Sequence, residues 1–61
     1  MTADEIKELR RKLGLTQTAF AMRVGVTVDS LRRYEHGLRS PAPRVAMVLR
    51  GLAAAEKEQA A

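Results

Sequence analysis

Threonine and glycine punctuate the first 37 residues of the chain at regular intervals. The pairs are Thr2 with Gly14, Thr16 with Gly25, and Thr27 with Gly37. A threonine N-cap accepts a hydrogen bond from the first turn of a helix, and a glycine ends a helix by adopting a left-handed backbone conformation. No segment alternates apolar and polar residues as a strand would. The sequence therefore predicts three short helices in a row.

Apolar residues recur at helical spacing within each of these segments, which predicts one inward face per helix. The first segment also opens with a capping box, in which Thr2 and Glu5 satisfy each other's backbone amides. The predicted inward residues are Ile6, Leu9, Arg10 and Leu13 in the first helix, Phe20, Ala21 and Val24 in the second, and Leu31 and Tyr34 in the third.

A fourth helix is expected after a short connector that contains two prolines. Proline is tolerated in the first turn of a helix, so this helix should begin near Pro43 or Arg44. Beyond Gly51 the alanine-rich sequence should continue the helix for about two turns and then fray. The predicted apolar stripe of the fourth helix consists of Val45, Val48, Leu49 and Leu52.

The length of 61 residues corresponds to one small domain. We expect a single domain over residues 1–61, with a core over residues 3–54 and an alanine-rich tail over residues 55–61. The predicted fold class is all-α, a compact bundle of four helices, with a fifth helix left open.

Basic residues are concentrated in the middle of the chain. Residues 10–50 contain nine basic side chains and two acidic ones, a net charge of +7, whereas the whole chain carries +4 because both ends are acidic. A basic middle between acidic ends is typical of a protein that binds a polyanion. Charge alone leaves DNA, RNA and anionic lipid open as partners.

Several classes of function are disfavoured by composition. The chain has no cysteine, so it can form no disulfide, thiolate zinc site or thiol nucleophile. His36 is the single histidine and has no cluster of carboxylates near it in the sequence, so we expect no enzyme activity, no metal site and no cofactor. Without a signal peptide or an apolar run of about 20 residues, the expected location is the cytoplasm.

A set of motifs at fixed spacing resembles the phage repressor and Cro family, also called the xenobiotic-response-element family. The resemblance covers roughly residues 5–52. The matching residues are Gly14-Leu15-Thr16-Gln17, Phe20-Ala21, Val24-Gly25-Val26, Leu31, Tyr34-Glu35, Gly37 and Pro41. The resemblance implies a lambda-repressor-like bundle with a helix-turn-helix, in which the second and third predicted helices flank the turn and the third is the recognition helix.

The function that this resemblance implies is sequence-specific DNA binding by a transcriptional regulator. Such a protein is expected to be a small repressor of phage, plasmid or bacterial origin that binds an operator through the major groove as a homodimer. Double-stranded DNA is thus the expected partner. An antitoxin-type module that binds a toxin and also represses its own operon is the alternative, and a membrane-bound basic peptide is disfavoured because glycines and prolines interrupt the helices.

The recognition helix is expected to carry the residues that read bases. Arginine is well suited to bind guanine, and Val28 is suited to pack on a thymine methyl group. Asp29 has two interpretations: it accepts from a cytosine amine, or it orients Arg32 or Arg33, which we favour because phosphates repel a carboxylate. The predicted base-contacting residues are Thr27, Val28, Asp29, Arg32 and Arg33.

A second group of residues is expected to contact the DNA backbone. Gln17 opens the second helix, where the family places a phosphate clamp, and helix N-termini attract anions in general. The alternative for Gln17 is an ordinary exposed side chain. The predicted phosphate-contacting residues are Thr16, Gln17, Arg23, Ser30, Gly37, Arg39, Ser40 and Arg44.

Two further roles follow from the resemblance and from the fourth helix. In the family, residues at the positions of Arg10 and Glu35 form a partly buried ion pair that joins the first helix to the third. The candidate dimer interface is a second stripe on the fourth helix, formed by Met47, Gly51 and Ala54. Gly51 would permit close approach of a second helix, and the alternative is a merely tolerated surface glycine.

Overall fold

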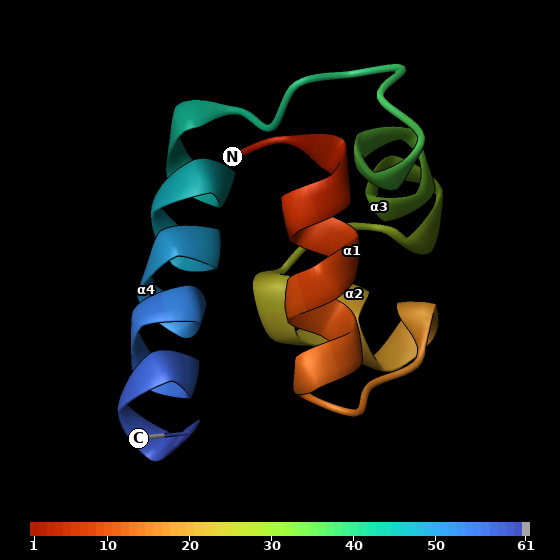
Figure 1. Cartoon of the computed structure of the whole chain (residues 1–61). Coiled ribbons are helices and arrows are strands. Elements are labelled where there is room, and N and C mark those ends of the chain that lie inside the picture. The colour runs from red at the N-terminus through yellow and green to blue at the C-terminus, as the bar shows by residue number, and fades with distance from the viewer. Residues whose placement is uncertain (61) are drawn as a thin grey trace.

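Four α-helices joined by short loops make up the computed structural model of this chain (Figure 1). The structure describes residues 1–60. The helices are α1 (Ala3–Lys12), α2 (Gln17–Val24), α3 (Val28–Glu35) and α4 (Pro43–Ala60). The prediction of an all-α bundle is confirmed, and the fifth helix left open by the sequence is not found among the described residues.

The predicted caps form at all three threonines. Thr2 accepts a hydrogen bond from the amide of Glu5 at 3.2 Å, and the Glu5 carboxylate accepts one from the amide of Thr2 at 2.7 Å, which completes the capping box. Thr16 and Thr27 cap α2 and α3 in the same way. Each hydroxyl accepts a hydrogen bond from the amide three residues later, at 3.1 Å in each case. Each threonine thus satisfies an amide that the first turn of its helix leaves without a partner.

The buried core contains every large residue predicted for the inward faces of α2 and α3. Its members are Ile6, Leu9, Phe20, Ala21, Val24, Leu31, Tyr34 and Leu49. Leu13 is only half-buried at the end of α1. Because these residues come from all four helices, one core holds the whole domain together.

The predicted apolar stripe of α4 is wrong at one position. Val48 is 37% exposed, whereas Val45, Leu52 and Ala53 pack against the core beside the buried Leu49. The separation of Val45, Leu49, Leu52 and Ala53 by four, three and one residues places them on one face, and Val48 lies at its edge. The helix also remains regular to Ala60, so the predicted continuation past Gly51 is observed and fraying before Ala60 is not.

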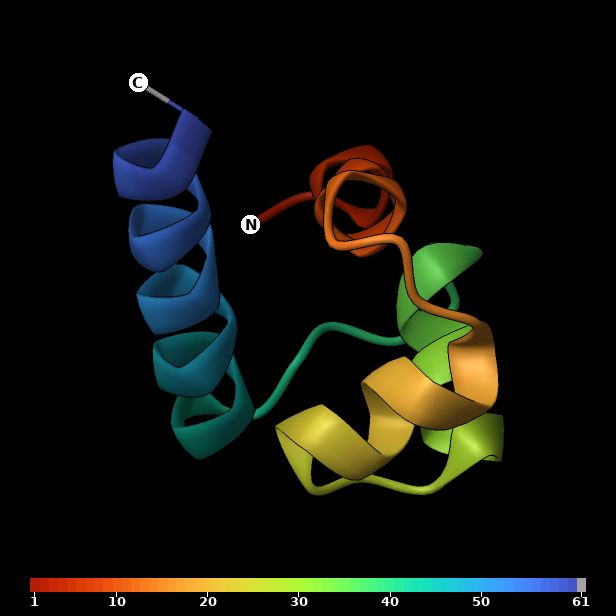
Figure 2. The same cartoon turned by 90° about the horizontal axis from the view of Figure 1, so that it is seen from below.

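The helices are arranged with α1 in the middle of the molecule. In Figure 2, α1 is seen nearly along its axis with α4 on one side and α3 on the other, and α2 runs below α1 toward the start of α4. Both α3 and α4 pack against α1 and α2. This arrangement leaves the outer side of α3 uncovered by the C-terminal helix.

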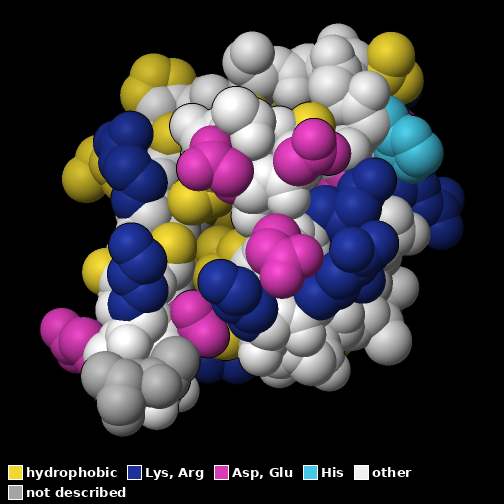
Figure 3. All heavy atoms as spheres, in the orientation of Figure 1, with side chains coloured by type: hydrophobic (Ala, Val, Ile, Leu, Met, Phe, Trp, Pro, Cys, Tyr) yellow, Lys and Arg dark blue, Asp and Glu magenta, His cyan; other side chains and the backbone are white. Residues whose placement is uncertain are grey.

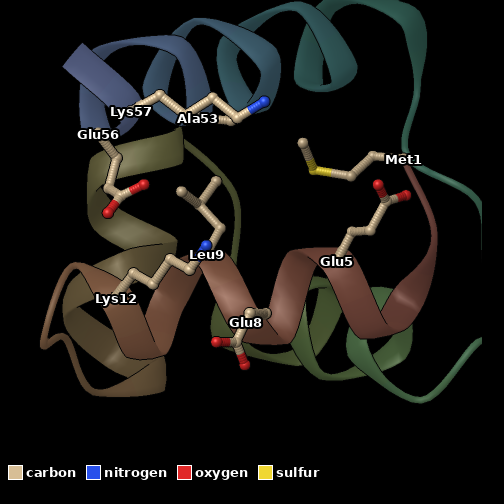
Figure 4. Close-up of a pocket in the computed structure, with 8 residues that line it drawn as sticks. All are labelled: Met1, Glu5, Glu8, Leu9, Lys12, Ala53, Glu56 and Lys57. Atoms are coloured by element: carbon tan, nitrogen blue, oxygen red, sulfur yellow. The ribbon is translucent and has the colours of Figure 1, made fainter. Parts of the chain in front are cut away.

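A shallow groove runs between α1 and α4 (Figure 4). Its apolar lining comes from Met1, Leu9 and Ala53, and the small side chain of Ala53 leaves the space open. Charged side chains of both signs surround it, namely Glu5, Glu8, Lys12, Glu56 and Lys57. The groove therefore has no predominant sign of charge that would attract a ligand. It lies on the side of α1 that faces away from α3.

Candidate nucleic-acid interface

The turn between α2 and α3 sets the direction of α3. Gly25 ends α2 with a φ of +86°, in the left-handed region that favours glycine. The amides of Gly25 and Val26 both donate to the carbonyl of Ala21, at 2.9 and 3.0 Å, and Val26 packs against the core. Ala21 is itself 2% exposed, so its small side chain lets the two helices approach closely. The result is a helix, a tight turn and a second helix that projects its outer face into solvent.

Charged side chains occupy the outer face of α3. Asp29, Arg32 and Arg33 are all exposed. The Nη2 of Arg33 lies 3.1 Å from Oδ2 of Asp29, one turn earlier on the same helix. Of the two interpretations of Asp29, the free protein therefore displays the one in which it orients an arginine.

The first turn of α3 is less exposed to solvent than the sequence indicates. Val28 was expected to face outward, but its side chain is half-buried and packs against the core. Ser30 is also half-buried, and its hydroxyl accepts a hydrogen bond from the hydroxyl of Thr27 at 3.0 Å. Only part of Val28 is thus accessible to a partner, because the rest of its side chain packs against the core.

The residues predicted to contact phosphate are spread over both ends of α2, the first turn of α3, the connector after α3 and the first turn of α4. All of them are exposed except Gln17 and Ser30, which are half-buried. Figure 3 shows lysine and arginine side chains gathered on the side of the molecule where α3 lies, beside the histidine, and a second column of them along α4. Acidic side chains lie between these two groups. The exposed residues are Thr16, Arg23, Gly37, Arg39, Ser40 and Arg44.

A buried ion pair between Arg10 and Glu35 lies on the inner side of α3. The Nε of Arg10 lies 2.8 Å from Oε2 of Glu35, and the side chains are 19% and 1% exposed. The guanidinium of Arg10 also donates to Oε1 of Glu35 at 3.3 Å and to the carbonyl of Leu15 at 3.2 Å. Arg10 therefore ties α1 both to α3 and to the loop that precedes α2.

Gln17 joins this ion pair to the exposed face, a connection that the sequence analysis missed. Its Nε2 donates to Oε1 of Glu35 at 3.2 Å, and its Oε1 accepts from Nε of Arg32 at 3.4 Å. Arg32 and Glu35 lie 15 and 18 positions after Gln17 in the chain. Local sequence patterns carry no signal for contacts of that range, because these depend on how the helices pack.

The candidate dimer residues lie on the exposed side of α4. Met47 is 67% exposed, and Gly51 and Ala54 follow it four and seven residues later. This spacing places the three on one face, opposite the residues that pack against the core. Apart from its chain neighbours and the backbone of its own helix, nothing lies within 4 Å of the position that a Cβ would take at Gly51.

Other kinds of site find little support in the described residues. His36 is exposed at the C-terminal end of α3. Within residues 1–60, no group of three or more histidine or acidic side chains is placed to hold a metal ion. None of the helices in this part of the chain is both long enough and apolar enough to cross a membrane.

Comparison with known proteins identifies the same region. The helix-turn-helix family model matches residues 6–49, from the first turn of α1 to the buried Leu49 of α4. The match includes α1 from Ile6 onward, all of α2 and α3, and the connector that follows α3. Neither the search of curated proteins nor that of solved structures gave a significant match.

Proposed function

The chain belongs to the Cro/C1-type helix-turn-helix family of DNA-binding transcriptional regulators, and on that basis we propose that it is a repressor that binds a specific operator. The proposed origin is a phage, a plasmid or a bacterial chromosome, and the proposed place of action is the cytoplasm, where the operator lies. The main observation in support of this proposal is that Arg32 and Arg33 are both exposed on the outer face of α3.

The proposed mode of binding places α3 in the major groove. B-DNA has a major groove about 12 Å wide, which admits one α-helix, and a recognition helix reads base edges mainly from its N-terminal part. Thr27, Asp29 and the two arginines form the accessible part of the predicted base-reading set, and Val28 contributes the exposed remainder of its side chain. In the free protein, the ion pair with Asp29 would then hold the Arg33 side chain along α3 before DNA binds.

Backbone contacts are proposed on either side of α3. Thr16 and Gln17 mark the start of α2, and Arg39, Ser40 and Arg44 follow α3 in the chain. Helix N-termini and arginine side chains both attract phosphate, and such contacts fix orientation without reading sequence. The concentration of basic residues between positions 10 and 50 supports this arrangement.

Dimerisation through α4 completes the proposal. One domain of this size spans about half of an operator, and dimers of such domains bind inverted repeats. Met47 is a large apolar side chain with 67% exposure, and Gly51 leaves room for a second helix beside it. The proposed interface is therefore the α4 stripe of Met47, Gly51 and Ala54, packed against the same stripe of a second copy.

Selection of bound sequences from random DNA duplexes at two salt concentrations tests this function. We expect a defined motif with two inverted half-sites about one helical turn apart. We also expect binding to weaken steeply as salt rises, because phosphate contacts release counterions. Recovery of random sequences at both salt concentrations would contradict sequence-specific repression, and a motif without a repeat would contradict the dimer alone.

A further inference from the structure

Gln17 lies between a buried carboxylate and an exposed arginine. Its side chain is half-buried at the first position of α2 and makes one hydrogen bond in each direction. The inner partner is Oε1 of Glu35, whose side chain is 1% exposed, and the outer partner is Nε of Arg32. A single amide therefore connects the interior of the domain with the outer face of α3.

The chemistry of Glu35 sets the orientation of that amide. An ionised carboxylate only accepts hydrogen bonds, so it requires the NH2 group of Gln17 rather than the carbonyl oxygen. Arg10 donates hydrogen bonds to both oxygens of the same carboxylate, which keeps the carboxylate in place. With its NH2 group turned inward, Gln17 presents only an acceptor to the outer face, and this acceptor suits a donor such as Arg32.

The neighbouring arginines of α3 are consequently held by different partners. Arg32 is held from α2 through its Nε, and neither of its terminal nitrogens has a hydrogen-bond or ion-pair partner among the described residues. Arg33 is held through its Nη2 by Asp29, on α3 itself. In a helix-turn-helix complex the first helix of the motif crosses the DNA backbone, and the second lies in the groove. An arginine held against α2 is thus directed toward phosphate, and one held along α3 toward bases.

We propose that Gln17 is a positioning residue that holds Arg32 toward the DNA backbone, so that base reading falls to Arg33. This inference rests on the proposed function and refines two of its contacts. Gln17 acts through Arg32 instead of contacting phosphate with its own side chain. Arg32 contacts the DNA backbone and is no longer assigned to the residues that read bases. The ion pair of Arg10 and Glu35 supports the arrangement from inside.

Separate substitutions of the two arginines test the division of roles. Arg32→Ala should weaken binding to all sequences alike, leave the selected motif unchanged, and reduce the slope of log K against log salt by about one. Arg33→Ala should make particular base pairs of the motif degenerate. Both side chains are exposed, so both variants are expected to fold. If the motif loses a base preference in Arg32→Ala, the inference is wrong.

A double-mutant cycle tests the role of Gln17. We expect Gln17→Ala to weaken operator binding about three- to tenfold in the parent chain and less than about twofold when Arg32 is already alanine. Thr18→Ala, an exposed neighbour on α2, serves as the matched control and should leave affinity unchanged. Equal losses in both backgrounds would show that Gln17 contacts DNA independently, which overturns the inference.

A measurement on the free protein keeps the test decisive even where Gln17→Ala folds poorly. The Nε–H proton of Arg32 should exchange with water more slowly than those of Arg23 and Arg39, and equal exchange rates would contradict the inference. A parent chain that selects no DNA motif would contradict the proposed function and this inference together. If the parent chain selects a motif but the effects of Gln17→Ala and Arg32→Ala on affinity are additive, this inference alone is contradicted.

Discussion

The carboxylate of Glu35 and the guanidinium of Arg10 meet at 2.8 Å between α3 and α1, 25 residues apart in the chain. The Glu35 side chain is almost completely removed from solvent, and Arg10 together with Gln17 supplies its hydrogen bonds. The attraction within a buried ion pair adds little net stability. Removal of one partner costs much more, because it leaves an unpaired charge in the interior of the protein.

Glu35→Ala is expected to reduce the free energy of unfolding by about 3 to 5 kcal/mol, because it strands Arg10 in a partly buried site. In a domain of this size, that loss is a large part of the total stability. Chemical and thermal unfolding would measure it. Arg11→Ala is the control, since its pair with Glu8 is exposed and 3.9 Å long, and it should change stability very little. An unchanged thermal midpoint for Glu35→Ala would refute the structural role.

Arg33 and Arg39 are expected to differ in how their loss affects DNA binding. Arg33→Ala should relax discrimination at particular base pairs, at a cost of about 1 to 3 kcal/mol for the best operator. Arg39→Ala should weaken specific and random DNA equally, because Arg39 lies in the connector after α3. Affinities for the operator and for single-base variants, measured at two salt concentrations, distinguish the two effects. The same profile for both variants would show that Arg33 reads no base.

Alanine should have opposite effects at two glycines. Gly25 has a φ of +86°, so Gly25→Ala should lower stability by about 1 to 2 kcal/mol through backbone strain. Gly51 lies inside α4 with open space around its Cβ position, so Gly51→Ala should raise stability by about 0.5 to 1 kcal/mol. Unfolding of both variants at a protein concentration where the chain is monomeric provides the comparison. Destabilisation by Gly51→Ala under that condition would contradict the solvent-exposed position of Gly51.

The capping box predicts a dependence of stability on acid pH. Hydrogen bonds from the backbone and the side chain of Thr2 hold the pKa of Glu5 below its ordinary value of 4.5. A carboxyl group with a lowered pKa in the folded state stabilises the fold above its unfolded pKa, and this contribution is lost as the pH falls through the folded value. In the Glu5→Gln variant, the decline of the thermal midpoint below pH 4.5 should be shallower than in the parent. Parallel curves for the two chains would argue against a charged capping box.

The proposed α4 interface predicts that a charge at Met47 separates the dimer. Met47→Glu should leave the fold intact, because the side chain is largely exposed, and should prevent two copies from burying it against each other. Sedimentation at high protein concentration, with and without operator, would show the change. Met22→Glu is the matched control, since Met22 is also exposed but lies on α2. A parent chain that remains monomeric under both conditions would rule out this interface.

Much of the fold was predictable because its signals are local. Each threonine cap acts on an amide only three residues away, and Gly25 determines its own turn. The buried faces of α2 and α3 followed from helical spacing alone. Val28 and Val48 were assigned less accurately, because spacing identifies an apolar face but not how widely the neighbouring helix covers it.

The sequence by itself determined where the first three helices begin and end, most of the large side chains that form the core, and the segment that presents arginines to a polyanion. These properties arise from hydrogen bonds and periodicities within a few residues. Only the tertiary structure decided that Glu35 lies within reach of both Arg10 and Gln17, and that Arg32 and Arg33 are held from different helices. Such contacts join residues far apart in the chain, so they form only after burial of the core has fixed the helices against one another.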